Sequence, residues 1–468
     1  MTEEKTYDVV VIGSGPGGYT AAAKASELGM AVACVEKFPR LGGVCLNVGC
    51  IPSKALLDSS EYFFMAGHQF PGHGILINDL KLDLMAMMTR KDRVIEDLTG
   101  QVRKLLQAGH VDIIEGTARI GDAHHVEVMG GDVTPIVLNA RFILIATGSA
   151  PVGIQGVEFD GFRIVSSTGA LHFSEVPRQL GIIGGGYIGL ELGSVWQRLG
   201  SQVTVIEAQP QIAGSLDGQI GRTLKRILSK QGMLFRLKTN VIHADVSEEL
   251  VTLTMESGGK EDRQGFDRVL VAVGRKPHTD GLGLKSVGVE RDDRGFIRIN
   301  AGFQTRIPSI YAAGDVVPGP MLAHKASAEG IAAIENMCGI PSEVNYDTMP
   351  SVIYTSPEVA SAGLTEEQAR QRDIPCVIGT YPFTGNGRAR CMGENEGLVK
   401  IISHARTDRI LGIHIIGQRA SEMIAEGVMA METGASSEDI ARIVHSHPTF
   451  SEAVMDAASA VQRQINHK

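Results

Sequence analysis

Apolar runs that end in glycine-rich turns organise the first part of the chain. Residues 7–12 (YDVVVI) are rich in β-branched side chains and lead into a glycine-rich run at 13–18 (GSGPGG), which an alanine-rich segment follows over 20–28. This order predicts a strand, a tight turn and a helix. A second apolar stretch over 31–35 predicts another strand, which ends at Glu36.

The same pattern occurs again further along the chain. Residues 180–183 lead into GGGYIG at 184–189, which a helical pattern and a strand over 202–206 follow, ending at Glu207. Each acid lies 23 residues after the first glycine of its turn. One G-x-G-x-x-G pattern is weak evidence, but here the strand, the helix and the terminal acid lie where a dinucleotide-binding fold needs them. We therefore expect two dinucleotide-binding units, in which the glycines approach a pyrophosphate and Glu36 and Glu207 accept hydrogen bonds from ribose hydroxyl groups.

Later apolar strands belong to these two units. Residues 142–148 (FILIATG) close the first unit, and 269–275 (VLVAVGR) repeat that signal at the end of the second. A third strand and glycine turn over 310–315 ends at Asp315. We favour a cofactor contact for Asp315, although an acid at this place also fits an ordinary turn.

The pattern changes after about residue 346. Two apolar runs, 398–403 and 410–416, flank a polar turn and predict a β-hairpin, hence an antiparallel sheet. Helical patterns follow over 421–433 and 451–464. Because this region has no cofactor signature, we expect it to serve in packing, in assembly or in completing a site.

Composition narrows the functional classes. The 468 residues are 43% hydrophobic and 21% charged, which is enough chain for several globular domains. A net charge of −9 gives no basic surface for nucleic acid or for an anionic membrane. The first residues lack the features of a signal or transit peptide, and no apolar run reaches the length of a membrane span. We therefore expect a cytoplasmic protein, in which a disulfide is more often catalytic than structural.

Two of the six cysteines, Cys45 and Cys50, lie in the stretch 42–54 (GGVCLNVGCIPSK). Zinc ribbons need paired Cys-x-x-Cys motifs, so this spacing argues against a metal site and favours a disulfide. Five residues of regular helix rise about 7.5 Å, more than the roughly 4.4 to 6.8 Å between the Cα atoms of a disulfide. The pair must therefore straddle an irregular helix start, which would place Cys50 at a positive helix end that favours a thiolate. Two inert, buried thiols fit the spacing alone equally well.

A second candidate constellation lies near the C-terminus at 445–452 (HSHPTFSE). His447 precedes a proline and is therefore extended or in a turn, and Glu452 begins a predicted helix. A carboxylate that bonds one imidazole nitrogen orients the ring and raises its basicity, as in a general base with its orienting partner. No third ligand accompanies the two histidines, so we expect no metal here. A surface histidine beside a helix end remains the alternative.

Taken together, these segments resemble the dihydrolipoyl dehydrogenase family of flavoproteins, within the disulfide oxidoreductases related to glutathione reductase. The resemblance rests on 42–54, both glycine turns with their acids, 312–315 (AAGD), 350–355 (PSVIYT) and 445–452. It implies an α/β fold with two Rossmann-like domains, a central domain and a C-terminal α+β dimerisation domain. The implied boundaries are 1–149 for an FAD-binding domain with the redox disulfide, 150–276 for an NAD-binding domain, 277–345 for the central domain and 346–468 for the dimerisation domain.

The resemblance also implies roles for single residues. Cys45 would be the thiol that the substrate meets, Cys50 the thiol against the flavin, and His447 a base held by Glu452 and supplied by the other subunit of a homodimer. The implied contacts with FAD and NAD, which include a pairing of Lys54 with Glu191, involve Gly13, Gly15, Gly18, Glu36, Gly43, Lys54, Gly116, Thr147, Gly148, Asp315, Ala323, Gly184, Gly186, Gly189, Glu191, Glu207, Val241 and Gly274.

The implied activity is oxidation of protein-bound dihydrolipoyl groups with reduction of NAD⁺, and the implied partners are lipoyl-bearing acyltransferase subunits or the glycine cleavage lipoyl protein. Glu207 suits the ribose hydroxyl of NAD, and residues 208–210 (AQP) offer no arginine for the phosphate of NADP. This departs from glutathione reductases, which use NADPH. A flavin-bearing scaffold without catalysis is the alternative from another class, but both residue pairs that the chemistry needs are intact.

Overall fold

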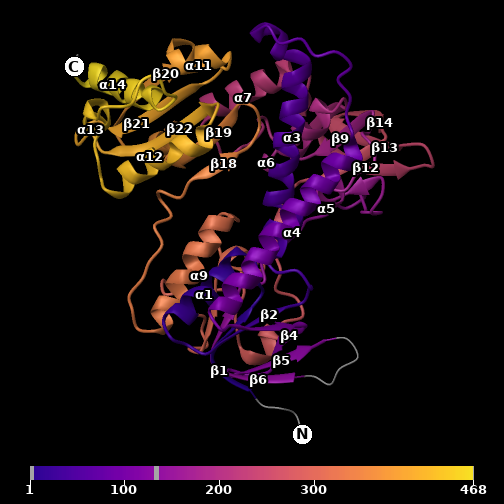
Figure 1. Cartoon of the computed structure of the whole chain (residues 1–468), viewed down its shortest axis with the longest axis vertical. Coiled ribbons are helices and arrows are strands. Elements are labelled where there is room, and N and C mark those ends of the chain that lie inside the picture. The colour runs from indigo at the N-terminus through magenta and orange to yellow at the C-terminus, as the bar shows by residue number, and fades with distance from the viewer. Residues whose placement is uncertain (1–4, 131–135, 467–468) are drawn as a thin grey trace. The chain divides into compact units, whose positions relative to one another are not determined.

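The computed structural model describes residues 5–130 and 136–466 and divides into two compact units. The first unit comprises Met1–Leu56, Asp83–Val152 and Gly274–Val344, and the second comprises Leu57–Leu82, Gly153–Val273 and Asn345–Lys468. Both units are therefore assembled from segments that lie far apart in the sequence, as the colours of Figure 1 show. Each unit is described by itself.

The first unit is built on a mainly parallel sheet in the order β3-β2-β1-β6-β5-β4, with β17 beside the C-terminal half of β6. Side chains of β1 alternate between two apolar clusters, Val10 and Ile12 on one face and Val9 and Val11 on the other. A strand buried on both faces reads as a continuous apolar run, which is why residues 7–12 showed no alternation. The strands are β1 (Lys5–Ile12), β2 (Val32–Glu36), β3 (Asp112–Glu115), β4 (Thr117–Ile120), β5 (His125–Met129), β6 (Ile136–Ile145) and β17 (Ile310–Ala312).

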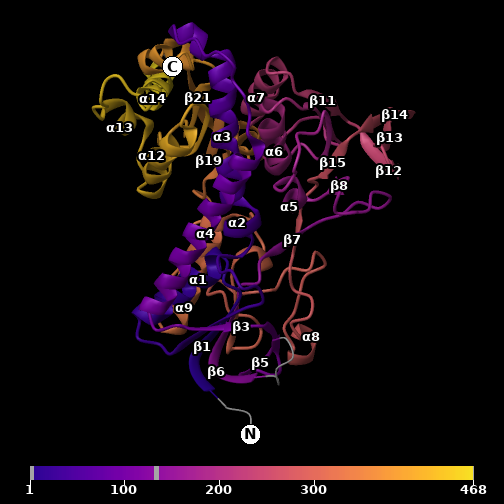
Figure 2. The same cartoon turned by 45° about the vertical axis from the view of Figure 1, so that its right-hand side comes forward.

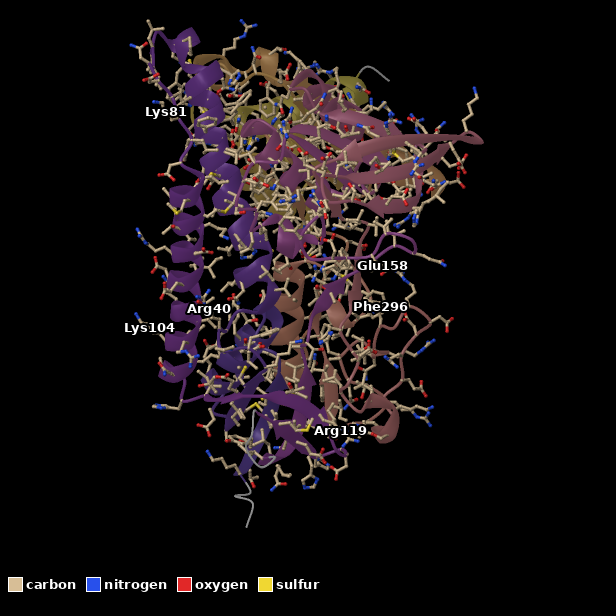
Figure 3. The ribbon with its side chains drawn as sticks, turned by 90° about the vertical axis from the view of Figure 1, so that its right-hand side faces the viewer. Arg40, Lys81, Lys104, Arg119, Glu158 and Phe296 are labelled. Carbon is tan, nitrogen blue, oxygen red and sulfur yellow. The ribbon has the colours of Figure 1, made fainter. Side chains whose placement is uncertain are left out.

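Helices cover one face of this sheet. In the lower part of Figures 1 and 2, α1 (Pro16–Glu27) and α9 (Ala323–Met337) lie side by side. Their close approach requires glycine, because a Cβ atom on Gly330 would collide with the carbonyl oxygen of Gly17. The remaining elements of the unit are α2 (Gly43–Val48), the start of α3 (Cys50–His68), α4 (Leu84–Ala108), α8 (Leu284–Val287), the 3-10 turn η2 (Gly314–Val316) and the antiparallel pair β7 (Ser149–Pro151) and β16 (Arg275–Pro277). Figure 3 shows exposed side chains of this unit, among them Lys104 on α4 and Arg119 on β4.

The second unit begins with another parallel sheet, in the order β11-β10-β9-β15-β8. Its parts are β8 (Ile164–Val165), β9 (Gln179–Ile183), β10 (Gln202–Glu207), β11 (Leu234–Leu237) and β15 (Arg268–Val271), with the helices α5 (Ser167–Ala170), α6 (Tyr187–Arg198) and α7 (Gly218–Lys230). A three-stranded antiparallel sheet, β12 (Asn240–Val246), β13 (Val251–Ser257) and β14 (Lys260–Phe266), stands between β11 and β15 in the chain. The repeat of strand, turn, helix and strand that the sequence predicts is therefore confirmed.

An antiparallel sheet in the order β18-β19-β22-β21-β20 forms the C-terminal part of the second unit. The predicted hairpin is confirmed, since β21 and β22 pair antiparallel and residues 405–409 connect them. The elements are β18 (Ser351–Ile353), β19 (Glu358–Gly363), α10 (Glu366–Gln371), β20 (Cys376–Pro382), the 3-10 turn η3 (Phe383–Gly385), α11 (Gly387–Met392), β21 (Leu398–His404), β22 (Ile410–Gly417), α12 (Ala420–Glu432), α13 (Ser437–Arg442) and α14 (Glu452–Asn466), and the 3-10 turn η1 (Phe70–His73) also belongs to this unit.

A buried ion cluster ties α7 to the C-terminal sheet. Lys400 Nζ lies 2.9 Å from Asp217 Oδ2 and 2.6 Å from Glu366 Oε2, and the lysine side chain is 1% exposed. Asp217 also accepts a hydrogen bond from the amide of Gln219 as the N-cap of α7. Buried charges of this kind are tolerated only when they are paired, so the cluster fixes the start of α7.

None of the helices over residues 5–130 and 136–466 has both the length and the apolar character that crossing a bilayer requires.

Candidate active site and cofactor sites

The two candidate redox cysteines lie on either side of a break between two helices. Cys45 is within α2, Gly49 breaks the helix with φ −140° and ψ −114°, and Cys50 is the first residue of α3. The irregular helix start that the spacing required is therefore present, and Cys50 lies at the positive end of a long helix. Gly42, with φ 95°, adopts the left-handed conformation that begins α2.

Both cysteines are half-buried, and the structure describes them as free thiols. A hydrogen bond with Cys50 and burial hold the pKa of Cys45 well above its ordinary value, and the nearby Lys54 opposes this only in part. A thiol with a raised pKa does not ionise unaided near neutral pH. The dithiol form of this site therefore needs a separate base to exchange protons.

The candidate base lies in the second unit with its predicted partner. His447 Nδ1 is 2.8 Å from Glu452 Oε1, and the amide of Thr449 donates to Glu452 Oε2 at 2.8 Å. The Thr449 amide and the imidazole hold the pKa of Glu452 below its usual range. The His447 side chain is 77% exposed, so its other ring nitrogen is available to a reacting group. The structure thus brings the predicted pair together in the arrangement of a base and its orienter.

The first glycine turn has the geometry that a dinucleotide requires. Gly13 has φ 102°, and a Cβ atom there would lie 2.5 Å from the carbonyl oxygen of Ala146. A Cβ atom on Gly18 would collide with the carbonyl oxygen of Gly13. Gly15, the N-cap of α1, has no side-chain cap, and the nearest atom to its added Cβ is 3.9 Å away. The three glycines therefore serve the turn, the open approach to a pyrophosphate and the helix packing in the way that this fold uses them.

The acid after β2 is fixed against this turn. Glu36 is 8% exposed, and its Oε2 accepts hydrogen bonds from the amide (3.0 Å) and the hydroxyl (2.7 Å) of Ser14. Its Oε1 accepts from the amide of Phe38 at 3.1 Å. Gly116, with φ 153°, donates its amide to the carbonyl oxygen of Glu36 at 2.9 Å.

Other predicted residues of the first site gather at the same edge of the sheet, because β1, β2, β6 and β17 are parallel and end in register. Asp315 Oδ2 accepts a hydrogen bond from the hydroxyl of Ser149 at 2.5 Å. Thr147 donates its hydroxyl to the carbonyl oxygen of His278, Gly148 has φ 73°, and Ala323 begins α9. Gly43 packs on the glycine turn, since its added Cβ atom would lie 2.6 Å from the Cα atom of Gly15.

The second glycine turn repeats this geometry. Gly184 has φ 106°, a Cβ atom on Gly189 would collide with the carbonyl oxygen of Gly184, and Gly186, the uncapped start of α6, faces open space. Glu207 accepts hydrogen bonds from the amides of Gly185 (2.6 Å) and Gln209 (2.7 Å). Both turns present uncapped helix amides and open backbone, so both fit the pyrophosphate of a dinucleotide.

For four predicted site residues, the structure does not test the predicted contacts. Glu191 is 3% exposed and accepts a hydrogen bond from the amide of Tyr354, while Lys54 belongs to the first unit, so their pairing stays a prediction. Val241 lies on β12 of the second unit and Gly274 in the first unit, and their contacts with NAD also stay predictions.

Several polar residues of the site escaped sequence reasoning. Arg275 donates to the hydroxyl of Ser149 at 2.7 Å and thereby reaches Asp315 through it. Lys325 and Glu329 form a fully buried ion pair beside Gly314. The only signal for this pair was an i, i+4 spacing of opposite charges in an alanine-rich helix, which more often marks an exposed pair.

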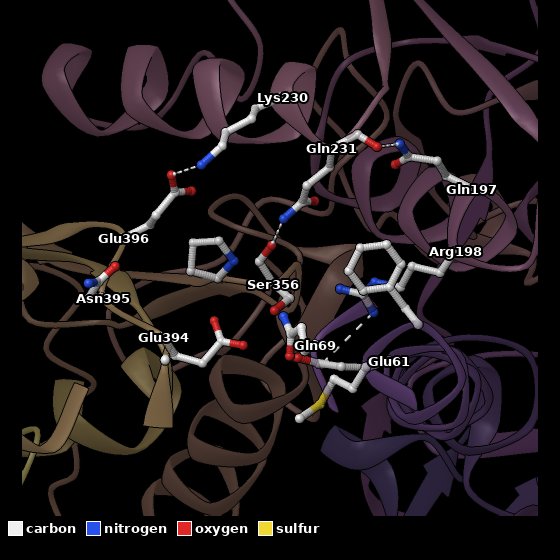
Figure 4. Close-up of a pocket in the computed structure, with 14 residues that line it drawn as sticks. Glu61, Gln69, Gln197, Arg198, Lys230, Gln231, Ser356, Glu394, Asn395 and Glu396 are labelled. Atoms are coloured by element: carbon white, nitrogen blue, oxygen red, sulfur yellow. Dashed lines mark hydrogen bonds and ion pairs between the residues drawn. The ribbon is translucent and has the colours of Figure 1, made fainter. Parts of the chain in front are cut away.

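A cavity of about 360 Å³ in the second unit, with a mixed polar and apolar lining, contains none of the predicted site residues (Figure 4). Arg198 lies in its wall with Nη1 donating to the carbonyl oxygen of Leu57 at 3.2 Å, and Lys230 pairs with Glu396 at 2.8 Å. Among the described residues, no group of three or more His, Cys, Asp or Glu side chains could hold a metal ion.

Comparison with known proteins agrees with this geometry. Residues 7–330 match the family described as pyridine nucleotide-disulphide oxidoreductase, and residues 349–458 match its dimerisation domain. The chain is 50% identical over 460 residues to dihydrolipoyl dehydrogenase 3 of Pseudomonas aeruginosa, covering 98% of each chain. It is 48% identical over 462 residues to the mitochondrial dihydrolipoyl dehydrogenase of Pisum sativum, covering 98% of this chain and 92% of that one. A solved structure of the HOCl-induced flavoprotein disulfide reductase RclA from Escherichia coli matches with a TM-score of 0.88 and 28% identity, covering 98% of this chain and 100% of that one.

Proposed function

This chain belongs to the pyridine nucleotide-disulphide oxidoreductase family, and we propose that it is an FAD- and NAD-dependent dihydrolipoyl dehydrogenase. It oxidises protein-bound dihydrolipoyl groups to lipoyl disulfides and reduces NAD⁺ to NADH. The observation that carries the proposal is the position of the cysteine pair. Cys45 and Cys50 straddle the start of α3, and Gly43 of the same stretch packs on Gly15 of the first glycine turn. Relatives at 48% and 50% identity that bear this name support the choice within the family.

The thiol chemistry follows from the pair. In the oxidised enzyme, one substrate thiolate attacks Sγ of Cys45, the Cys45–Cys50 bond breaks, and Cys50 leaves as a thiolate. The second substrate sulfur then attacks the first, which closes the lipoyl disulfide and releases the sulfur of Cys45. A leaving thiolate on Cys50 is favoured by the positive end of α3.

His447 has the proton-transfer role. It takes the proton of the substrate thiol before attack, and Glu452 keeps the ring oriented and stabilises its charged form. The match to the dimerisation domain supports a homodimer, and we propose that the partner subunit supplies this base to the cysteine pair of each chain. The turn at Gly13, Gly15 and Gly18 would hold FAD, which would supply an acceptor for the electron pair of the dithiol, and the turn at Gly184, Gly186 and Gly189 would hold NAD⁺ as the final hydride acceptor.

The finer assignments belong to the same proposal. We place the FAD-binding domain at 1–149, the NAD-binding domain at 150–276, the central domain at 277–345 and the dimerisation domain at 346–468. The lipoyl substrate is carried by acyltransferase subunits or by the glycine cleavage lipoyl protein, and the protein acts in the cytoplasm.

An anaerobic titration of the purified holoenzyme with dihydrolipoamide tests this function. We expect a long-wavelength absorbance from a Cys50 thiolate beside oxidised flavin, and then NADH formation when NAD⁺ is added. A protein without bound FAD, or one whose flavin spectrum does not respond to dihydrolipoamide, would refute the proposal.

A further inference from the structure

One residue beside the first cofactor site is held from both sides by a buried ion pair. Lys325 and Glu329, one turn apart on α9, are both 0% exposed, and Lys325 Nζ lies 3.1 Å from Glu329 Oε1. Lys325 Nζ donates to the carbonyl oxygen of Gly314 at 3.0 Å, and Glu329 Oε2 accepts from the amide of Gly314 at 2.8 Å. We call Lys325 and Glu329 the Gly314 clamp.

Two buried charges are an unfavourable way to fill space in a protein core, so the clamp calls for another role. Removing two charges from water is unfavourable, and apolar residues of similar volume often give equal or higher stability. The neighbouring positions on α9, such as Ala332, Ala333 and Ile334, are apolar and equally buried. What the charges add is directional: together they fix the amide and the carbonyl group of a single residue.

Gly314 is the residue at which β17 turns towards Asp315. It has φ 83°, and a Cβ atom there would lie 3.2 Å from the Cβ atom of Ala326 on α9, so the turn suits glycine alone. Glycine has no side chain that could restrain its backbone. Here the hydrogen bonds from Lys325 and to Glu329 on α9 restrain the carbonyl and amide groups of Gly314. The direction of the next residue, Asp315, depends on it.

The Asp315 side chain is held independently from the opposite side. Its Oδ2 accepts from the hydroxyl of Ser149, and Arg275 donates to that hydroxyl (2.7 Å) and to the Ser149 carbonyl oxygen (2.7 Å). In the described part of the chain, no hydrogen bond reaches the other carboxylate oxygen, Oδ1. Asp315 is thus fixed through its backbone and through one oxygen, with one acceptor left for a ligand.

We propose that Lys325 and Glu329 are positioning residues for the flavin, which act by fixing Gly314 so that Asp315 Oδ1 accepts a hydrogen bond from a hydroxyl group of FAD. This inference rests on the proposed function, since it requires FAD at the first turn. A preorganised acceptor binds without the cost of ordering it on binding. The clamp should therefore slow the release of FAD more than it stabilises the fold.

The main test replaces both clamp residues by apolar ones in the holoenzyme. In Lys325→Met/Glu329→Leu no unpaired charge remains, so we expect the variant to fold. We expect it to release FAD at least tenfold faster than the wild type, measured by the gain of flavin fluorescence on dilution, and to show a shifted flavin midpoint potential. Lys400→Met is the matched control, because it breaks the buried ion cluster of Lys400, Asp217 and Glu366 in the second unit. It should lower the unfolding temperature while the rate of FAD release stays within twofold.

Unchanged FAD release in the double variant, or equal acceleration in Lys400→Met, would overturn the proposal. If the double variant does not fold, Glu329→Asp replaces it, because the shorter side chain keeps the charge beside Lys325 but cannot reach the Gly314 amide. Release at least threefold faster is expected, and an unchanged rate overturns the clamp. Wild-type protein that holds FAD and responds to dihydrolipoamide keeps the proposed function standing in either case, whereas wild-type protein without FAD refutes that function itself.

Discussion

The two dinucleotide turns share one design, but the acid beside the first turn is more deeply buried and has more hydrogen bonds than the acid beside the second. Their first glycines have φ 102° and 106°, and a Cβ atom on either third glycine would collide with the carbonyl oxygen of the first. In the first unit, however, Glu36 is buried and also bonds the Ser14 hydroxyl, whereas Glu207 is partly exposed and bonds only backbone amides. The first unit also adds β17, with Asp315 and the Gly314 clamp, at the edge of its turn.

This difference matches the two tasks of a flavoprotein dehydrogenase. A resident flavin is retained by contacts that close around it, while a nicotinamide substrate must enter and leave in each cycle. The same strand, turn and helix can serve both tasks because retention is set by the elements added at the edge, not by the glycine turn itself. Substitutions in the two units should therefore have different effects on FAD retention and on NAD⁺ binding.

Replacing either cysteine should abolish the reaction with the dithiol substrate, while electron transfer between NADH and the flavin is retained. We expect Cys45→Ser and Cys50→Ser each to abolish dihydrolipoamide-dependent NADH formation, because the exchange needs both sulfurs. FAD should remain bound, and NADH should still reduce the flavin. Steady-state assays with dihydrolipoamide and rapid-reaction spectra with NADH measure the two halves. Cys338→Ser, which changes an exposed thiol, is the control, and appreciable turnover in either redox variant would contradict the assignment.

Replacing His447, the proposed base, should slow only the thiol half of the reaction. For His447→Gln we expect reduction by dihydrolipoamide to fall by roughly 10²- to 10⁴-fold, the usual contribution of general acid–base catalysis. NADH-to-flavin transfer needs no such base and should stay within about twofold. His172→Gln, an exposed histidine elsewhere in the second unit, serves as the control. Equal slowing of both half-reactions would show that His447 does not act on the thiols.

Both glycine turns and the pairs Cys45/Cys50 and His447/Glu452 could be predicted from the sequence, because each has a local signature. Strands buried on two faces gave apolar runs, the turns needed glycine, and Glu36 and Glu207 ended strands. It missed Lys325, whose burial depends on contacts between α9 and a turn before it in the chain. Nothing in the residues around Lys325 distinguishes a buried lysine from the solvated one that its type usually is.

The segments that make up each unit also could not be predicted from the sequence. The first unit combines segments that end at Leu56 and begin again at Asp83 and at Gly274. Local patterns predict elements well, but which elements share a core depends on pairings such as β17 with β6, more than 160 residues apart. The redox state of Cys45 and Cys50 is equally beyond the sequence, since the spacing of a redox pair is the same in both of its states.

Alanine in place of Gly18 or Gly189, the last glycine of each G-x-G-x-x-G pattern, tests whether the two turns bind different ligands. Each added Cβ atom would collide with the carbonyl oxygen of its own turn. We expect Gly18→Ala to yield protein depleted of FAD, and Gly189→Ala to yield FAD-containing protein whose KM for NAD⁺ rises by at least tenfold. Flavin absorbance per chain and steady-state kinetics measure the two effects. Gly100→Ala on α4, where nothing lies within 4 Å of the added atom, should change neither. Loss of FAD from Gly189→Ala instead would reverse the assignment.

The charge of Glu207 should decide between NAD and NADP. Glu207→Gln keeps an acceptor for the Gly185 amide but removes the charge that repels a 2′-phosphate and strengthens the bond to a ribose hydroxyl. A hydrogen bond to a charged group contributes about 1.5 to 3 kcal/mol, so we expect the preference for NAD⁺ over NADP⁺ in kcat/KM to fall roughly tenfold or more. Wild-type enzyme that uses both cofactors equally well would contradict the role of Glu207.

The smallest effect should come from the hydroxyl that the first turn has and the second lacks. Ser14→Ala removes the hydrogen bond from the hydroxyl group to the Glu36 carboxylate but leaves the bond from the amide of residue 14 to the same oxygen. A hydrogen bond to a charged group contributes about 1.5 to 3 kcal/mol, but this one orients Glu36 and does not itself touch the flavin. We therefore expect only part of that energy to affect FAD release, which should accelerate about two- to tenfold while the KM for NAD⁺ stays unchanged. If release is unaffected, the additional closure of the first turn resides in β17 and the Gly314 clamp, and the burial of Glu36 has no part in holding the flavin.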